Sequence, residues 1–441
     1  MSKKIVILGA GKSSSFLIKY LYNNRNELDI SLNIASDYRP KYIDDFEEIS
    51  FINLDIKDKE KLLKVIQDSF IVVSLLPPFL HFEIAEICSY NKINMITASY
   101  LDDKIKTLEK TFVDNNCFLF MEMGLDPGID HMSAMKMIDK LSVSSKIIEF
   151  ESYTGGLVKL DKENNPWGYK FTWNPMNVIL AGADGANYLK DGVNKSIPYE
   201  KIFKDFTSIV IPGEEGFEGY PNRNSLMYKD LYKLKDIQTL KRGTLRHKGF
   251  CETWSLLIEL GLTSNSKTLY NNKKMTFFDF FNHKIKAKNA EDLIKYLDKK
   301  HGVKRTSLVY KNLEWSGFFS NKKIPIVKGK ISDFLLSVLM DKWTLSDGDI
   351  DLIVMTHSIV YESEKTQNKI LSYLKIEGED NVYTAMSKTV GLPIAVLIEH
   401  IIKNRIQKKG IHLPFSKDIY QPILKKLKKL GVEFTEIETN I

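Results

Sequence analysis

Short apolar runs alternate with helical patterns over the first 122 residues. Residues 5–8 and 70–76 are nearly continuous apolar segments, and apolar side chains recur at every second position over residues 28–34. Residues 12–25 and 58–68 instead have helical spacing of apolar positions. Continuous apolar runs suit strands buried on both faces, and strands that alternate with helices form parallel sheets with right-handed crossovers. The pattern therefore predicts an α/β fold with a doubly wound parallel sheet.

The pattern changes near residue 124. A helical segment over residues 129–141 and a strand at 147–154 lead into a stretch rich in Gly, Pro, Asn and aromatic residues. Residues 255–345 are mainly helical in pattern, and a long apolar helix followed by a basic amphipathic helix is expected to close the chain. Because 441 residues exceed the usual size of one core, we expect two or three domains.

The distribution of charged and apolar residues bears on whether the protein binds nucleic acids or membranes. The net charge is +7, with basic and acidic residues interleaved, and the one basic run, at 425–429, suits the exposed face of a helix. No nucleic-acid partner is therefore expected. The N-terminus lacks a signal-peptide pattern, and no window approaches 18 uninterrupted apolar residues, so no membrane association is expected either.

The cysteines indicate the redox compartment. Cys88, Cys117 and Cys251 are odd in number and widely spaced, which suggests neither a disulfide framework nor a metal site. We therefore expect no metal, and a reducing, cytoplasmic location.

A glycine-rich loop lies between the first strand and the first helix. In the sequence Gly9-Ala10-Gly11-Lys12-Ser13-Ser14, the first glycine permits a tight turn and the second lets backbone N–H groups approach a pyrophosphate at the helix N-terminus. Ser14 replaces the third glycine of the usual fingerprint and is small enough for close packing. The alternative is an ordinary tight turn. In this context we expect Gly9, Gly11, Lys12, Ser13 and Ser14 to bind a dinucleotide on a Rossmann domain.

Further candidates stand where strands of the predicted sheet end. In open α/β sheets, ligands bind beyond the carboxyl ends of the strands. The candidate pairs are Ser36 and Asp37, Asp55 and Ile56, Leu76 and Pro77, and Ser99 and Tyr100. For the last three pairs a purely structural role is an equal alternative, and for Asp37 the alternative is a solvated acid at a strand end.

Asp37 bears on the choice of cofactor. An acid at the end of the second strand can bind the adenosine ribose hydroxyls and repel a 2′-phosphate, which favours NAD. Arg39 and Lys41 follow closely and could accept that phosphate. The sequence therefore predicts NADP or NAD without choosing between them.

Two loops carry arginines in otherwise non-basic surroundings. These are residues 220–224, with Arg223, and residues 242–246, with Arg246. Guanidinium groups bind carboxylates and phosphates bidentately, so both loops are candidate anion clamps. The alternative for each arginine is a surface ion pair.

These motifs together resemble one family. The segments 124–131, 165–171, 220–223, 242–246 and 385–391 occur in the order found in saccharopine dehydrogenases of the glutamate-forming type. The resemblance implies a Rossmann domain at 1–123 completed by C-terminal helices at 392–441. It also implies a second α/β domain at 124–254 and 346–391, which supplies substrate contacts and forms a homodimer, with a mostly helical insertion at 255–345.

The implied reaction interconverts saccharopine, NAD(P)+ and water with glutamate, 2-aminoadipate 6-semialdehyde and NAD(P)H. The resemblance places substrate contacts at Ser99, Tyr100, Leu125, Asp126, Arg223, Thr244, Leu245 and Arg246. It places nucleotide contacts at Gly11–Ser14, Ser36, Asp37, Asp55, Ile56, Leu76 and Pro77. Asp126 is our first choice of general base, with His131 and Tyr100 as alternatives.

Two other functions compete with this one. The first is a related imine-reducing, condensing enzyme such as a carboxynorspermidine synthase, which would need fewer carboxylate clamps than Arg223 and Arg246 supply. The second is a protein that binds NAD(P) without turnover, against which Asp126, Arg223 and Arg246 argue.

Overall fold

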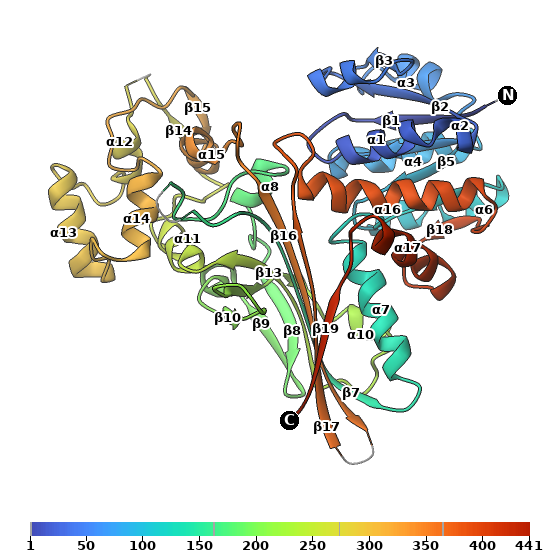
Figure 1. Ribbon diagram of the computed structural model, residues 1–441. Helices are drawn as coiled ribbons and strands as arrows, with labels where there is room; N and C mark the ends of the chain where they lie inside the picture. Colours follow the sequence, from blue (N-terminus) through green and yellow to red (C-terminus); the bar gives the residue numbers. More distant parts are fainter. Residues whose placement is uncertain (1, 162–163, 273, 364–365) are drawn as a thin grey trace. The chain divides into compact units, whose positions relative to one another are not determined.

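The computed structural model describes residues 2–161, 164–272, 274–363 and 366–441. The chain forms two compact units, each with its own sheet (Figure 1). Unit 1 comprises Met1–Ser145 and Ile376–Thr435, and unit 2 comprises Lys146–Lys375 and Glu436–Ile441.

Unit 1 contains a parallel sheet with the strand order β18-β6-β5-β4-β1-β2-β3. Its strands are β1 (Lys3–Leu8), β2 (Ile30–Ser36), β3 (Ser50–Asn53), β4 (Ile71–Ser74), β5 (Asn94–Thr97), β6 (Phe118–Phe120) and β18 (Gly410–His412). Residues 5–8 of β1 are completely buried, as their continuous apolar run requires. The predicted doubly wound parallel sheet is confirmed.

Unit 1 also contains helices, several of which pack on this sheet (Figure 1). They are α1 (Ser15–Asn23), α2 (Arg25–Leu28), η1 (Lys41–Asp45), α3 (Lys59–Ile66), η2 (Pro78–Leu80), α4 (His81–Tyr90), α5 (Asp103–Lys106), α6 (Glu109–Asp114), α7 (Ile129–Leu141), α16 (Ala385–Ile402) and α17 (Lys417–Lys429). A Cβ atom on Gly391 of α16 would lie 2.8 Å from the backbone nitrogen of Leu17 in α1. This glycine therefore lets the C-terminal part of the chain pack closely on the helix that follows the Gly9–Ser14 loop.

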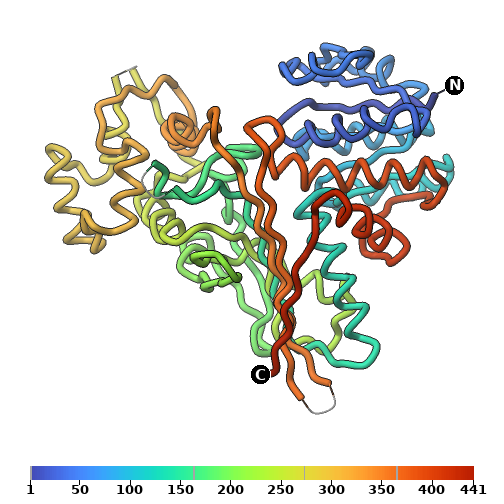
Figure 2. The backbone as a smooth tube through the Cα atoms, in the orientation of Figure 1, coloured from blue at the N-terminus to red at the C-terminus, as the bar shows by residue number. Residues whose placement is uncertain are grey.

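Unit 2 contains a mixed sheet with the main strand order β10-β11-β13-β7-β16-β17-β19, to which β8, β9 and β12 attach. Its strands are β7 (Lys146–Val158), β8 (Ala186–Lys190), β9 (Val193–Ile197), β10 (Thr207–Ile209), β11 (Phe217–Pro221), β12 (Arg223–Asn224), β13 (Thr239–His247), β16 (Asp351–Ser363), β17 (Thr366–Glu377) and β19 (Thr435–Asn440). The end of the chain follows β17 as the edge strand β19 (Figure 2).

The rest of unit 2 is mainly helical. Its elements are α8 (Pro175–Ile179), α9 (Tyr199–Ile202), α10 (Tyr228–Leu231), α11 (Phe250–Glu259), β14 (Thr268–Tyr270), α12 (Phe277–Phe281), α13 (Ala290–His301), α14 (Leu308–Trp315), β15 (Lys328–Lys330) and α15 (Ile331–Trp343). Trp167, Phe250, Trp254 and Trp343 pack ring against ring at its core. The aromatic density that stood out in the sequence thus belongs largely to this core.

The two units divide the chain differently from the expected domains. Helix α7 lies in unit 1 although it follows Gly124, because it packs against α17, where the Tyr420 hydroxyl donates to Asp139 at 2.5 Å. The segment 392–441 is not purely helical: β18 extends the first sheet, and the last six residues belong to unit 2. Strands this short leave no periodic signal in a sequence.

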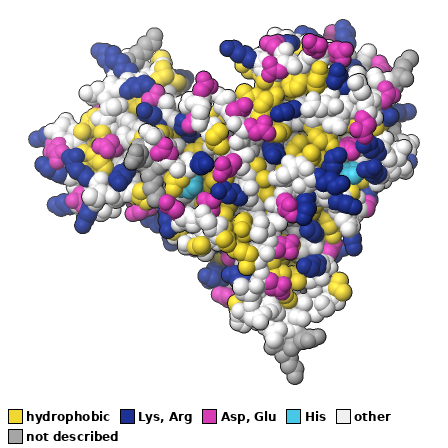
Figure 3. All heavy atoms as spheres, viewed as in Figure 1, with side chains coloured by type: hydrophobic (Ala, Val, Ile, Leu, Met, Phe, Trp, Pro, Cys, Tyr) yellow, Lys and Arg dark blue, Asp and Glu magenta, His cyan; other side chains and the backbone are white. Residues whose placement is uncertain are grey.

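One helix among the described residues, α16, is long and apolar enough to cross a membrane by length and composition alone. Its apolar window is 78% buried inside the structure, as the core helix of a soluble protein also is. On the face shown in Figure 3, Lys and Arg side chains are interspersed with Asp and Glu.

Candidate active site

The Gly9–Ser14 loop leaves β1 and enters α1. Gly9 has a φ of +95° and its Cβ would lie 3.2 Å from the Leu75 carbonyl oxygen, so a side chain is excluded there. A Cβ on Gly11 would meet no atom of the described residues within 4 Å. The backbone at Gly11 is thus open to a ligand, while Gly9 serves the turn. This arrangement fits a dinucleotide phosphate at the N-terminus of α1.

Ser14 shapes this loop with its side chain. Its hydroxyl donates to the Gly11 carbonyl at 2.7 Å and lies 2.7 Å from the Tyr42 hydroxyl. Ser14 is completely buried, and burial raises the pKa of Tyr42 to about 12. A Ser14 contact with a cofactor would therefore come from its backbone, since its hydroxyl is already bound. Sequence reasoning missed Tyr42, which lies 28 residues away.

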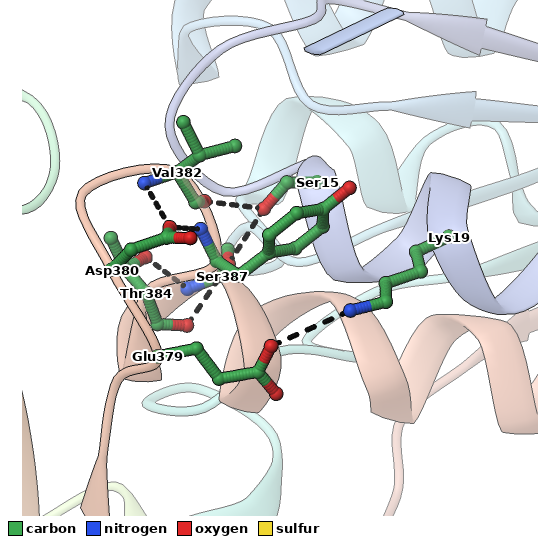
Figure 4. Close-up of polar contacts among 8 residues, drawn as sticks. Ser15, Lys19, Glu379, Asp380, Val382, Thr384 and Ser387 are labelled. Carbon is green, nitrogen blue, oxygen red and sulfur yellow. Dashed lines mark hydrogen bonds and ion pairs between the residues drawn. The ribbon is translucent and has the colours of Figure 1, made fainter. Parts of the chain in front are cut away.

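The C-terminal segment of unit 1 holds the next residue, Ser15, by hydrogen bonds (Figure 4). The Ser15 hydroxyl donates to the Val382 carbonyl at 2.7 Å and to the Ser387 hydroxyl at 2.8 Å. Thr384 caps α16 by accepting from the Ser387 N–H at 3.0 Å. The start of α1 is therefore held by residues more than 360 positions away.

Asp37 lies exposed at the end of β2, where the Ser36 hydroxyl donates to it at 3.4 Å. The Arg39 guanidinium donates to Asp44 from Nε and Nη2 at 2.9 and 2.7 Å and stacks over the Phe51 ring at 5.1 Å. Both an acid and a cation thus stand where an adenosine ribose is expected. The pair Asp55–Ile56 follows the adjacent strand β3, and Leu76–Pro77 follows β4.

Tyr100 and Asp126 lie together. The Tyr100 hydroxyl donates to Asp126 Oδ1 at 2.8 Å, and both side chains are partly buried. Their loops are held side by side because the Glu122 N–H donates to the Ser99 carbonyl and the Met123 N–H donates to the Thr97 carbonyl, at 3.0 and 3.1 Å. Two of the three predicted acid–base candidates are thus brought together beyond the ends of β5 and β6.

The Asp126 loop requires glycine at both ends. Gly128 has a φ of +146°, and its Cβ would lie 2.1 Å from the Gly124 carbonyl oxygen. Leu125 is buried inside this loop, while Asp126 is partly exposed. The composition of the segment at 124–128 is therefore explained by its tight fold, which leaves Asp126 as its partly exposed acid.

His131, the third acid–base candidate, lies behind this loop. Its ring is completely buried, with Nε2 at 3.0 Å from Glu122 and Nδ1 at 3.4 Å from Asp130. Glu122 accepts from the Leu101 N–H at 3.0 Å, and Asp130 accepts from the Gly128 N–H at 2.6 Å. The geometry points to a bracing role for His131 rather than contact with a substrate.

In unit 2, three aromatic rings surround a buried arginine, Arg246. Arg246 is 4% exposed, and its guanidinium carbon lies 4.8, 5.0 and 5.8 Å from the ring centres of Tyr169, Phe250 and Tyr220. Its Nη1 donates to the Leu245 carbonyl at 2.8 Å, and its Nε has no hydrogen-bond partner among the described residues. A buried cation with an unpaired donor is suited to bind an anion.

The other predicted contacts of unit 2 lie on two strands, β13 and β12. Thr244 is partly exposed and pairs in register with Tyr220 across β11 and β13, while Leu245 is completely buried. Arg223 opens β12 and is exposed, with a φ of +55°. Ser99, Tyr100, Leu125 and Asp126 belong to unit 1 instead. No cluster of metal-ligating residues occurs in the described ranges.

Fold and site define a Rossmann-type dinucleotide-binding protein with a second α/β unit that contains a buried, incompletely paired arginine. Two family models match this chain: the saccharopine dehydrogenase NADP binding domain over residues 5–119 and the saccharopine dehydrogenase C-terminal domain over residues 124–432. The chain belongs to the saccharopine dehydrogenase family.

Relatives match along the whole chain. The saccharopine dehydrogenase [NADP(+), L-glutamate-forming] of Saccharomyces cerevisiae is 30% identical over 99% of both chains. The solved apo structure of the L-Glu-forming saccharopine dehydrogenase from that yeast superposes with a TM-score of 0.89, covering 99% of this chain and 100% of that one. The mitochondrial alpha-aminoadipic semialdehyde synthase of Bos taurus is 34% identical over 99% of this chain, which spans only 48% of that relative.

Proposed function

We propose that this protein catalyses the saccharopine dehydrogenase reaction of the glutamate-forming type. Saccharopine, NADP+ and water would give glutamate, 2-aminoadipate 6-semialdehyde, NADPH and a proton, or the reverse. The observation that carries this proposal is the full-length similarity of fold and sequence to the yeast enzyme. The small-molecule substrates follow from it, while the homodimer and the cytoplasmic location stay predictions.

The family's cofactor fits unit 1. The open backbone at Gly11 and the N-terminus of α1 would hold the pyrophosphate, with Ser36, Asp37, Asp55, Ile56, Leu76 and Pro77 along the same edge of the sheet. When bound, it supplies the hydride acceptor for oxidation of the substrate carbon–nitrogen bond. The protein has to orient the substrate and move protons.

Proton transfer is assigned to Asp126. Its carboxylate would accept the proton released as the secondary amine becomes an imine, and would then help water add to that imine. Tyr100 holds Asp126 in one orientation through the 2.8 Å hydrogen bond. The proton returns to nitrogen when the adduct collapses, leaving glutamate as the amine and the semialdehyde as the carbonyl product.

Arginine side chains are assigned to the carboxylates. Saccharopine carries three carboxylates, and Arg246 offers a buried, incompletely paired guanidinium that would bind one of them bidentately. Arg223, Thr244 and the backbone at Leu245 are assigned to the same task. This donor set suits a tricarboxylate better than a polyamine precursor.

The test is an absorbance assay of the purified protein with saccharopine and either NADP+ or NAD+. We expect formation of reduced nicotinamide that depends on saccharopine. Binding of nucleotide without turnover of saccharopine would overturn the enzymatic proposal in favour of a non-catalytic NAD(P)-binding protein.

A further inference from the structure

A buried histidine connects two strand ends in unit 1, and the proposed reaction has not used it. His81 opens α4 and is 1% exposed. Its Nδ1 lies 3.0 Å from the Ser74 hydroxyl at the end of β4, and its Nε2 lies 2.7 Å from the Ser99 hydroxyl beyond β5. Ser99 is one of the predicted substrate contacts and precedes Tyr100 directly.

The imidazole of His81 is neutral at physiological pH. Burial lowers its pKa to about 4, against a smaller opposing effect of Asp102. A neutral imidazole carries one proton on its two nitrogens, so one nitrogen donates and the other accepts. The direction of both hydrogen bonds is therefore set by a single choice of tautomer.

Ser74 determines which tautomer His81 adopts. Its side chain is completely buried, and His81 Nδ1 is the only hydrogen-bond partner of its hydroxyl among the described residues. If Nδ1 carried the proton, the Ser74 hydroxyl proton would be buried without an acceptor, which is costly. The Ser74 hydroxyl therefore donates to Nδ1, and Nε2–H donates to Ser99.

We propose that His81 is a positioning residue that makes Ser99 a hydrogen-bond donor to the substrate. Once the Ser99 oxygen accepts from Nε2–H, its own proton is directed away from the histidine. Ser99 is partly exposed, so this proton can reach a ligand. A donor of this kind suits a carboxylate oxygen of the substrate, and the inference thus rests on the proposed function.

A double-mutant cycle tests the coupling. His81→Phe removes the donor and should lower kcat/KM for saccharopine about tenfold or more, because a hydrogen bond to a charged group is lost. In a Ser99→Ala background the same substitution should change kcat/KM less than twofold. His81→Gln keeps a donor and should recover part of the loss. Tyr90→Phe, at an exposed position of the same helix, serves as the control.

Equal losses from His81→Phe in both backgrounds would overturn the proposal, because His81 would then act independently of Ser99. A second measurement does not need turnover. The ¹⁵N shifts of labelled imidazole, assigned to His81 by comparison with His81→Gln, should report the Nε2–H tautomer at neutral pH. An Nδ1–H tautomer would refute the inference even if the enzyme were active, whereas an inactive parent with the Nε2–H tautomer would refute only the proposed reaction.

Discussion

Arg246 combines burial, aromatic neighbours and an unused donor. Three rings surround its guanidinium, and its Nη1 bonds a backbone carbonyl, so the local structure compensates only part of the cost of burying the charge. A substrate carboxylate would supply the rest. The role proposed for Asp126 sets a different requirement, because a general base held by Tyr100 would still have to exchange protons.

Arg246→Ala should raise the KM for saccharopine about 10- to 100-fold, because a charge-assisted hydrogen-bond pair to a carboxylate is lost. Cofactor affinity should change little, since Arg246 lies in unit 2. Steady-state kinetics would measure the first effect, and fluorescence titration with NADPH the second. Lys248→Ala removes an exposed positive charge two residues away and is the control. Equal losses for substrate and cofactor would show that Arg246 has another role.

Asp126→Asn should lower kcat by about 100-fold or more, the usual contribution of a general base. Tyr100→Phe should lower kcat about tenfold, because it removes the hydrogen bond that orients Asp126. Rapid-mixing kinetics with saturating saccharopine would measure the rate of nicotinamide reduction in each variant. An Asp126→Asn variant with undiminished kcat would exclude Asp126 as the base.

His131→Leu should reduce the free energy of unfolding by about 3–5 kcal/mol, because it leaves the buried Glu122 and Asp130 carboxylates without their shared partner. Urea unfolding would measure the loss. His283→Leu, at an exposed histidine, should change stability by no more than about 0.5 kcal/mol. Full stability in the His131 variant would contradict the bracing role.

At the scale of elements, the structure joins segments that the sequence separates. The start of α1 is held by Tyr42 after β2 and by Val382 and Ser387 near the start of α16. The periodic patterns predicted β1, the following helix and the glycine-rich loop, because those signals are local. The bracing partners could not be predicted, since they depend on tertiary packing rather than on spacing.

His81 and Ser74 illustrate the same limit at the candidate site. Tyr100 was predicted from its position at a strand end and from family resemblance, and Asp126 from its loop position and the same resemblance. His81 begins a helix whose apolar pattern says nothing of the hydroxyls on either side of its ring. Strand β18 shows the same limit outside the site. It is three residues long, too short for a periodic pattern in the sequence, and it pairs with a strand about 290 positions earlier.

The two glycines of the phosphate loop should respond differently to alanine. Gly11→Ala should leave thermal stability nearly unchanged, because its Cβ would meet no atom within 4 Å in the described part of the chain. It should weaken NADPH binding, because the added methyl group would occupy the open approach to the backbone. Gly9→Ala should lower the melting temperature, because its φ of +95° and the Leu75 carbonyl exclude a side chain. Calorimetry and fluorescence titration would measure these effects. A stability loss at Gly11 as large as at Gly9 would contradict the assignment.

At the scale of the whole molecule, two units divide the proposed work. Unit 1 contains the Gly9–Ser14 loop and the Tyr100–Asp126 pair, and unit 2 contains the buried Arg246. The sequence predicted both sets of residues but not the boundaries between the units. Helix α7 belongs to unit 1 and strand β19 to unit 2 because of the elements that each packs against. This packing is tertiary and cannot be read from the sequence pattern.

The central claim is that the chain cleaves saccharopine at its secondary amine. The most direct measurement is the stoichiometry of products when purified protein oxidises saccharopine with NADP+ or NAD+. One glutamate and one 2-aminoadipate 6-semialdehyde, trapped as its hydrazone, should form for each reduced nicotinamide. Reduced nicotinamide without glutamate, or no reaction while the nucleotide stays bound, would contradict the account.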